Sequence, residues 1–273
     1  MIAVALREAT ARLDPVSDSP RLDAELLMAH ACGISRDRLL LDPPASVPGA
    51  FDDLLARRLA GEPIAYIIGR RDFWTIELEV GPGVLIPRPD SEALLEGALD
   101  HFAKHAPARI LDLGTGPGSL LLAALDQWPG ATGLGIDASE TALAYARRNA
   151  SHLGMGDRAD FRLGNWGEGI DQRFDLVLCN PPYVAENSAD LGPGVAEFEP
   201  HEALFSGENG LEDYRILAPQ LARLVAPSGI VALEIGHDQA DAVAEIMANA
   251  GLSGVLRRDI AARPRALILQ LGA

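Results

Sequence analysis

Short apolar runs alternate with longer segments of helical periodicity from about residue 89 to the end of the chain. Phe174–Cys179 is typical of the apolar runs, which predict buried strands because they are short and almost entirely hydrophobic. The segments between the runs repeat apolar residues at the spacing of one helix face. This alternation predicts an α/β fold in which helices cover the faces of a sheet. The expected strands are 109–113, 133–137, 159–163, 174–179, 230–234, a run around Leu256 and 266–271, and the expected helices are 119–127, 139–151, 211–225 and 239–250.

The chain before about residue 60 has the pattern of short helices. Asp18-Ser19-Pro20 offers an N-cap followed by a proline in the first turn, and leucine residues then recur at helical spacing. Gly33 ends this pattern, and a further helix is expected from Phe51 to Ala60. The pattern therefore predicts a compact helical module.

The two arms of a β-hairpin are expected after this module. Ile64–Gly69 and Phe73–Val80 form the arms, and the alternation of polar and apolar residues is clearest in the second. We therefore expect a small helical domain over residues 1–75 that ends in a hairpin linker, and an α/β domain over residues 76–273.

Composition is that of a soluble globular protein. A chain of 273 residues, 48% of them hydrophobic, can bury the core of one large domain with a small appendage. No apolar run approaches the roughly 18 residues of a membrane span, and the N-terminus lacks the pattern of a secretion signal. Cys32 and Cys179 lie far apart and are expected to be buried free thiols. We therefore expect a cytoplasmic protein with no membrane partner.

The net charge of −16 argues against a partner that is bound mainly through phosphates. Affinity for nucleic acid comes largely from Lys and Arg side chains that neutralise backbone charge. DNA and RNA are therefore poor candidates for the substrate. The histidine residues show no spacing typical of metal ligands, so no metal is expected.

The glycine-rich loop after the first expected strand is a candidate cofactor site. Such loops bind ligands where a strand of an α/β sheet meets its helix, and Asp137 ends the next strand, where a carboxylate can accept ribose hydroxyl groups. A dinucleotide site would satisfy much of this logic. The Gly-x-Gly-x-Gly spacing and an Asp that begins the loop, suited to a methionine amino group, favour S-adenosylmethionine. Trp166 either packs against adenine or belongs to the core. The candidate cofactor residues are Asp112, Gly114, Thr115, Gly116, Pro117, Gly118, Asp137, Trp166 and Asn180.

Asn180-Pro181-Pro182-Tyr183 follows the expected strand Phe174–Cys179 and is called the Asn-Pro-Pro-Tyr turn below. Proline fixes φ and cannot continue a strand ladder, so the backbone is stiff where an amide and an aromatic ring are presented. The turn is suited to holding a planar NH2 group, which indicates chemistry on an amide or amine nitrogen. An ordinary proline-rich strand exit is the alternative interpretation.

With these features, the chain resembles the protein-(glutamine-N5) methyltransferases of the HemK/PrmC family, which modify class I peptide chain release factors. The resemblance runs along nearly the whole chain. Besides the loop and the Asn-Pro-Pro-Tyr turn, it includes Glu62–Gly69 with Phe73-Trp74, Val84–Glu92, Glu199-Pro200, Ala203-Leu204, Gly207, Gly210-Leu211, Tyr214-Arg215 and Leu233–Gly236 with Gln239.

The resemblance implies a Rossmann-like class I S-adenosylmethionine-dependent fold with Gly114–Gly118 as the cofactor loop, Asp137 as the ribose ligand and Trp166 beside adenine. It also implies that the helical domain recognises the release factor. Asn180 and Pro181 would accept the two N–H groups of the substrate glutamine, and Tyr183 would pack on the amide plane. Pro182 would complete this substrate site.

Three positions depart from the family pattern. Pro117 replaces the usual Thr, Asn165 replaces an Asp, and Ala262 replaces a Gly near Arg265. Pro117 removes a backbone donor, so it bears on cofactor affinity rather than on the type of reaction.

Two other functions are compatible with parts of the pattern. An amino-methyltransferase acting on an exocyclic nucleobase NH2 would use the same turn after base flipping, but the acidic charge argues against it. A catalytically idle binding module would not need the intact loop and turn. His201 and Glu202 lie near the Asn-Pro-Pro-Tyr turn in sequence only and are expected in a surface loop.

Overall fold

The computed structural model describes residues 1–188, 192 and 194–272, and its backbone contacts divide the chain into two units. Over the residues described, the smaller unit comprises Met1–Arg70, Val80–Pro82 and Asp190–Glu199. The larger unit comprises Arg71–Glu79, Gly83–Ala189 and Pro200–Ala273. Residue 75, where we placed the domain boundary, lies in the hairpin segment of the larger unit. Within the described ranges, no helix has both the length and the apolar character needed to span a bilayer.

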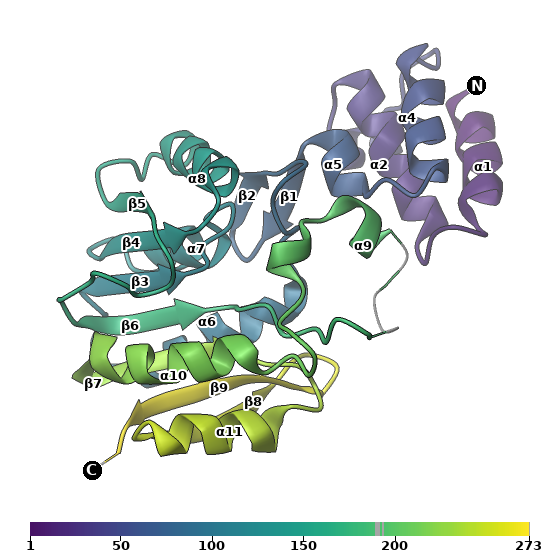
Figure 1. Ribbon diagram of the computed structural model, residues 1–273. Coiled ribbons are helices and arrows are strands. Elements are labelled where there is room, and N and C mark those ends of the chain that lie inside the picture. The colour runs from purple at the N-terminus through teal and green to yellow at the C-terminus, as the bar shows by residue number, and fades with distance from the viewer. Residues whose placement is uncertain (189–191, 193, 273) are drawn as a thin grey trace. The chain divides into compact units, whose positions relative to one another are not determined.

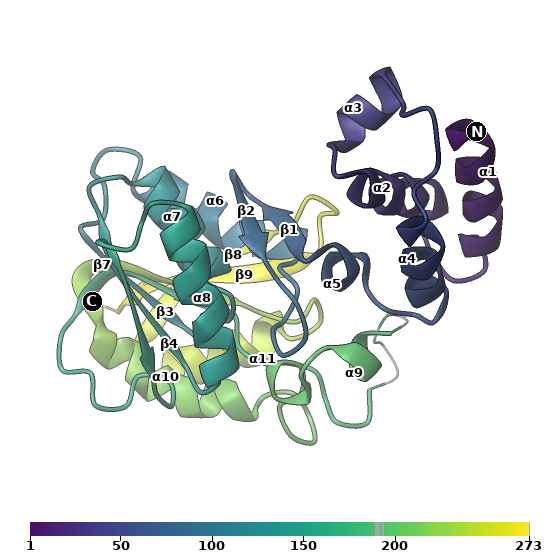
Figure 2. The same ribbon diagram turned by 90° about the horizontal axis from the view of Figure 1, so that it is seen from above.

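The smaller unit is built mainly from short helices, as the sequence predicts (Figures 1 and 2). Pro20 opens the second helix at its first position, and Gly33 ends that helix with a left-handed φ of 65°. Leu13, Leu27 and Phe51 pack together in its hydrophobic core. The helices are α1 (Ile2–Leu13), α2 (Pro20–Cys32), α3 (Arg36–Leu41), α4 (Ala50–Leu59), α5 (Ile64–Ile68) and α9 (Val195–Phe198).

The segment that we expected as the first hairpin arm is helix α5, so this prediction was wrong. The backbone N–H groups of Tyr66 and Ile67 both donate to the carbonyl of Pro63, which closes the helical turn. Gly69 then ends the helix with a φ of 75°. A run of five apolar residues carries no alternation that separates a strand from a buried helix. The hairpin forms instead between β1 (Arg70–Phe73) and β2 (Ile76–Glu79).

The larger unit contains a seven-stranded sheet in the order β5-β4-β3-β6-β7-β9-β8. All pairs from β5 to β7 are parallel, and β9 pairs antiparallel with both of its neighbours. Every predicted strand of the α/β region is confirmed, although β7 begins earlier than expected. The strands are β3 (Arg109–Leu113), β4 (Thr132–Asp137), β5 (Ala159–Leu163), β6 (Phe174–Cys179), β7 (Val225–Glu234), β8 (Leu252–Arg258) and β9 (Pro264–Leu271).

Helices cover both faces of this sheet (Figure 1). Leu113 and Cys179 share a core cluster with residues of α10 and α11 on one face. The alternate residue Asp112 faces α7 on the other, where it accepts a hydrogen bond from the backbone of Leu121. Cys179 is a buried free thiol, as expected, whereas the free thiol of Cys32 is only partly buried. The helices are α6 (Glu92–His101), which the sequence did not predict, and α7 (Ser119–Gln127), α8 (Glu140–His152), α10 (Glu212–Leu224) and α11 (Ala240–Asn249), which it did.

Candidate functional site

The glycine-rich loop, Asp137 and the Asn-Pro-Pro-Tyr turn all lie at the same edge of the sheet. Leu113 of β3 pairs with Ile136 of β4 on one side and with Cys179 of β6 on the other. The residues that follow are Gly114, Asp137 and Asn180, so the parallel register brings them to the same edge. The chain winds outward in opposite directions from β3 and β6, and this switch point is where open α/β sheets bind ligands.

Asp137 is tied to the glycine-rich loop. Its carboxylate accepts the backbone N–H of Gly116 at 2.8 Å and that of Ser139 at 2.9 Å. Burial raises the pKa of Asp137, and these backbone donors partly offset the increase. Each carboxylate oxygen accepts only one of these bonds and retains capacity for another donor. Asp137 is therefore positioned to hold the loop and a ligand together.

A pocket of about 530 Å³ opens at this edge of the larger unit. Gly114, Gly116, Asp137, Trp166, Asn180 and Pro182 are the predicted site residues that line it. Gly114 has a φ of 71°, and a β-carbon there would lie 3.1 Å from the Trp166 ring, so glycine favours both this backbone conformation and the close approach of the ring. Trp166 also packs against the core of the larger unit, so its place at the core is confirmed, whereas its contact with adenine stays a prediction.

The other predicted residues lie around the pocket rather than in its lining. Asp112 is part of β3 and does not begin the loop; it accepts a hydrogen bond from the Thr115 hydroxyl at 2.7 Å. Burial raises the pKa of Asp112 to about 7. Pro117 accepts a hydrogen bond from Asn149 through its carbonyl. The structure thus places these residues as supports of the loop. The predicted residues outside the lining are Asp112, Thr115, Pro117, Gly118, Pro181 and Tyr183.

Carboxylates give the pocket an acidic character that the sequence did not predict. Glu202 and Asp213 line it together with Asp137, and no Lys or Arg is among the described lining residues. Glu202 is exposed, as expected of a surface loop, but that loop folds back to the pocket. The backbone of Val184 exchanges hydrogen bonds with Leu204 and Ser206. These bonds hold the segment that contains Glu202 beside the pocket. His201 stacks on Phe205 instead. An acidic lining favours a positively charged ligand and disfavours phosphate groups.

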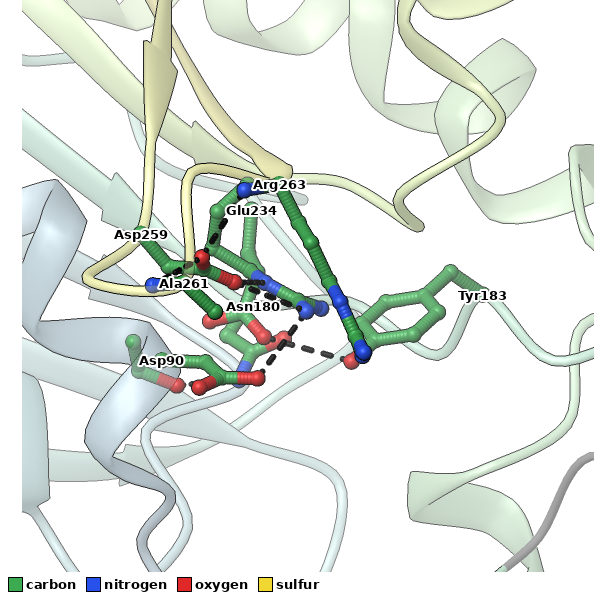
Figure 3. Close-up of polar contacts among 9 residues, drawn as sticks. Asp90, Asn180, Tyr183, Glu234, Asp259, Ala261 and Arg263 are labelled. Atoms are coloured by element: carbon green, nitrogen blue, oxygen red, sulfur yellow. Dashed lines mark hydrogen bonds and ion pairs between the residues drawn. The ribbon is translucent and has the colours of Figure 1, made fainter.

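The Asn-Pro-Pro-Tyr turn is anchored by polar groups from outside it (Figure 3). Asn180 donates through Nδ2 to the Ser91 hydroxyl at 3.2 Å. The Tyr183 hydroxyl donates to Glu234 Oε1 at 3.3 Å. Gln239 donates to the Tyr183 carbonyl at 3.0 Å and so fixes the backbone of the turn. Burial raises the pKa of the Tyr183 hydroxyl, which stays protonated as a donor.

Arg265 links two aspartates, Asp90 and Asp259, both of which are labelled in Figure 3. It forms ion pairs with Asp90 at 2.9 Å and with Asp259 at 3.2 Å. Burial raises the pKa of Asp259, but hydrogen bonds from the Arg263 backbone and Arg265 outweigh it and leave the pKa lowered. Asp259 accepts further bonds from the backbones of Ala261 and Arg263. This ionic group was not predicted, although Asp90 and Arg265 are among the residues noted in the resemblance.

Two family models match the chain. The PrmC N-terminal domain matches residues 4–69, and a methyltransferase domain matches residues 104–251. A release factor glutamine methyltransferase of Caulobacter vibrioides is 43% identical over 244 residues, which cover 87% of this chain and 84% of that protein. The chain belongs to the release factor glutamine methyltransferase family. The member from Vibrio cholerae serotype O1 is 39% identical over 277 residues, or 98% of this chain and 96% of that protein.

A solved structure supports the fold of this release factor glutamine methyltransferase family member. The ribosomal protein L11 methylase of Lactobacillus delbrueckii subsp. bulgaricus matches with a TM-score of 0.54 at 21% identity, over 72% of this chain and 84% of that one. The predicted Rossmann-like methyltransferase fold is therefore confirmed, and so is the predicted family.

Proposed function

We propose that this chain transfers a methyl group from S-adenosylmethionine to the side-chain amide nitrogen of the glutamine in the Gly-Gly-Gln motif of class I release factors. The observation that carries the proposal is the convergence of the loop, Asp137 and Asn180 on one pocket at the switch point of the sheet. The names of the relatives, release factor glutamine methyltransferases, support the choice of substrate.

The residues present fit S-adenosylmethionine. The Asp137 carboxylate keeps acceptor capacity for ribose hydroxyl groups, and Trp166 lines the pocket with an aromatic side chain suited to a flat group. When bound, S-adenosylmethionine supplies a methyl group attached to a positively charged sulfur. The carboxylates of Glu202 and Asp213 suit a cationic ligand, whereas the diphosphate of a dinucleotide would meet repulsion in this pocket.

The chemical task of the chain is to orient a weak nucleophile. The lone pair of an amide nitrogen is delocalised into the carbonyl, so the nitrogen must be held and aimed. Asn180 Oδ1 and the Pro181 carbonyl accept the two N–H groups, and the Tyr183 ring limits rotation of the amide plane. Alignment of this kind is worth up to about 7–11 kcal/mol in well-oriented systems. The proton leaves after the nitrogen has become cationic, so no strong general base is required.

Mass spectrometry of a release factor after reaction tests the proposal. We expect one added methyl group on the glutamine of the Gly-Gly-Gln motif. A release factor with that glutamine replaced by glutamate is the matched control and should stay unmodified. Labelling of DNA or RNA in place of release factor, with labelled cofactor, would instead favour the amino-methyltransferase alternative.

We further propose that the smaller unit binds the release factor. Among its described residues, Val4, Leu22, Leu40 and Leu41 are exposed large apolar side chains, and Leu41 is 86% exposed. Buried apolar anchors carry much of the energy of protein interfaces. Leu41→Asp is therefore expected to raise the KM for release factor about tenfold, a change of about 1.4 kcal/mol.

The Leu41→Asp variant should methylate a short Gly-Gly-Gln peptide at the wild-type rate, because such a peptide is too short to contact the smaller unit. Val255→Asp, at an exposed apolar residue of β8, is the matched control. An unchanged KM for release factor in Leu41→Asp would remove this side chain from the interface.

A further inference from the structure

The orientation of the Asn180 amide decides whether the turn can bind a substrate NH2 group. The amide carries an acceptor on one side, Oδ1, and a donor on the other, Nδ2. Only Oδ1 can accept a substrate N–H. If the amide turned over, Nδ2 would meet the substrate NH2 and two donors would face each other. A neighbour that binds Nδ2 is therefore required to hold the productive orientation.

Ser91 is that neighbour. Its side chain is buried at the end of the 3-10 turn Pro89–Ser91, and its Oγ accepts Nδ2 of Asn180 at 3.2 Å. A hydroxyl group can also donate, and it then favours the opposite orientation of an amide. Because a serine hydroxyl has one proton, the orientation of Asn180 depends on where that proton goes.

Glu234, the last residue of β7, is the acceptor available to the Ser91 proton. Its side chain is 1% exposed. Its Oε1 receives the Tyr183 hydroxyl, and its Oε2 is buried without a hydrogen-bond partner among the described residues. The Ser91 hydroxyl lies close enough to Glu234 to lower the pKa of this carboxyl as a donor. Oε2 itself accepts no hydrogen bond from the described residues. Rotation of the hydroxyl toward Glu234 would leave the Ser91 oxygen as an acceptor for Asn180.

We propose that Ser91 and Glu234 are positioning residues that hold Asn180 with Oδ1 toward the substrate amide. The inference rests on the proposed function. Ionised Glu234 accepts a hydrogen bond from the Ser91 hydroxyl, and the Ser91 oxygen can then only accept from Nδ2. Protonated Glu234 can donate to Ser91, which frees the Ser91 proton for Oδ1 and allows the amide to turn over. Glu234 also holds the Tyr183 hydroxyl, so one carboxylate orients both polar side chains of the Asn-Pro-Pro-Tyr turn.

The surroundings of Glu234 place its titration near neutral pH. Burial raises its pKa to about 7, against the lowering effects of Ser91, Arg265 and Tyr183, and Asp90 adds to the increase. Two further titratable groups face this region, Cys179 and Tyr214, and the Tyr214 hydroxyl donates to the Glu234 backbone carbonyl. Burial raises the pKa values of both groups, so both stay protonated. Asp259 stays paired with Arg265.

Kinetics of three variants test the inference. Ser91→Ala and Glu234→Gln should lower kcat about tenfold to a hundredfold, because the amide is no longer held, while the KM for cofactor changes less than about twofold. Ser91→Thr keeps the hydroxyl and should retain most of the activity. Wild-type kcat should rise with pH through about 7, as Glu234 ionises, and this step should be absent in Glu234→Gln. Ser151→Ala, at an exposed serine of α8, is the control.

A second measurement separates this inference from the proposed function. The side-chain NH2 of Asn180 gives an NMR signal that disappears in Asn180→Asp, and its exchange with solvent should be slow in the wild type and faster in Ser91→Ala and Glu234→Gln. This holds whichever substrate is methylated. Failure of the wild type to methylate release factor would refute the proposed function alone. Unchanged amide exchange and unchanged kcat in both variants would overturn the positioning role.

Discussion

Asn180→Ala is expected to lower kcat for release factor methylation by about a hundredfold to a thousandfold, the range observed when one preorganised hydrogen-bonding group of an active site is removed. Asn180 lines the pocket just beyond the end of β6, where the rigid prolines that follow prevent the backbone from compensating. Alanine leaves the substrate nitrogen free to rotate away from the methyl group. The loss should appear in single-turnover rates at saturating cofactor, where binding no longer limits the reaction.

Calorimetry should show nearly wild-type affinity of Asn180→Ala for S-adenosylmethionine, because Asp137 and the loop are untouched. Asn187→Ala is the matched control, since Asn187 is an exposed asparagine just beyond the turn and does not line the pocket. A rate within a few-fold of wild type in Asn180→Ala would contradict the assignment of this residue to substrate alignment.

The sequence predicted the parts of the site that depend on local pattern. Each predicted strand of the α/β domain forms, and parallel pairing of β3 with β4 and β6 brings Gly114, Asp137 and Asn180 together. No long-range information was needed, since the end of a strand and the start of a loop are both visible in the local sequence. The failure at α5 has the same origin, because five apolar residues in a row do not distinguish helix from strand.

The supports of the site could not be predicted in this way. Ser91 and Asn180 are 89 residues apart, and Tyr183 and Glu234 are 51 apart. Such contacts depend on how η1 (Pro89–Ser91) and β7 pack beside the Asn-Pro-Pro-Tyr turn, and the local pattern around each residue does not identify its partner. A buried acid in an apolar strand, Glu234 in Val231–Gly236, was the available signal, because such a group needs a partner.

The position of the Asp112 side chain also could not be predicted from the local sequence pattern. An acid just before a glycine loop is equally compatible with a ligand contact and with an internal support. Strand register decides between them, because it turns Asp112 toward α7 and leaves the pocket to Asp137. The carboxylate that binds Thr115 therefore shapes the loop from behind.

Asp137→Ala is expected to weaken S-adenosylmethionine binding by about a hundredfold, near 3 kcal/mol, which is typical of the loss of hydrogen bonds to a charged group. Alanine removes the ribose acceptor and also releases the backbone N–H groups of Gly116 and Ser139 that Asp137 now binds. Titration calorimetry measures the affinity directly. Asp171→Ala, at an exposed aspartate outside the pocket, should bind as the wild type does.

The response to cofactor concentration separates the two roles. Excess S-adenosylmethionine should restore much of the rate of Asp137→Ala, because the Asn-Pro-Pro-Tyr turn still aligns the glutamine once the cofactor is bound. No cofactor concentration should restore Asn180→Ala. Unchanged calorimetric affinity of Asp137→Ala would remove Asp137 from the cofactor site. A rate that stays low at saturating cofactor would mean that the Gly116 loop, which Asp137 holds, also positions the methyl group for attack.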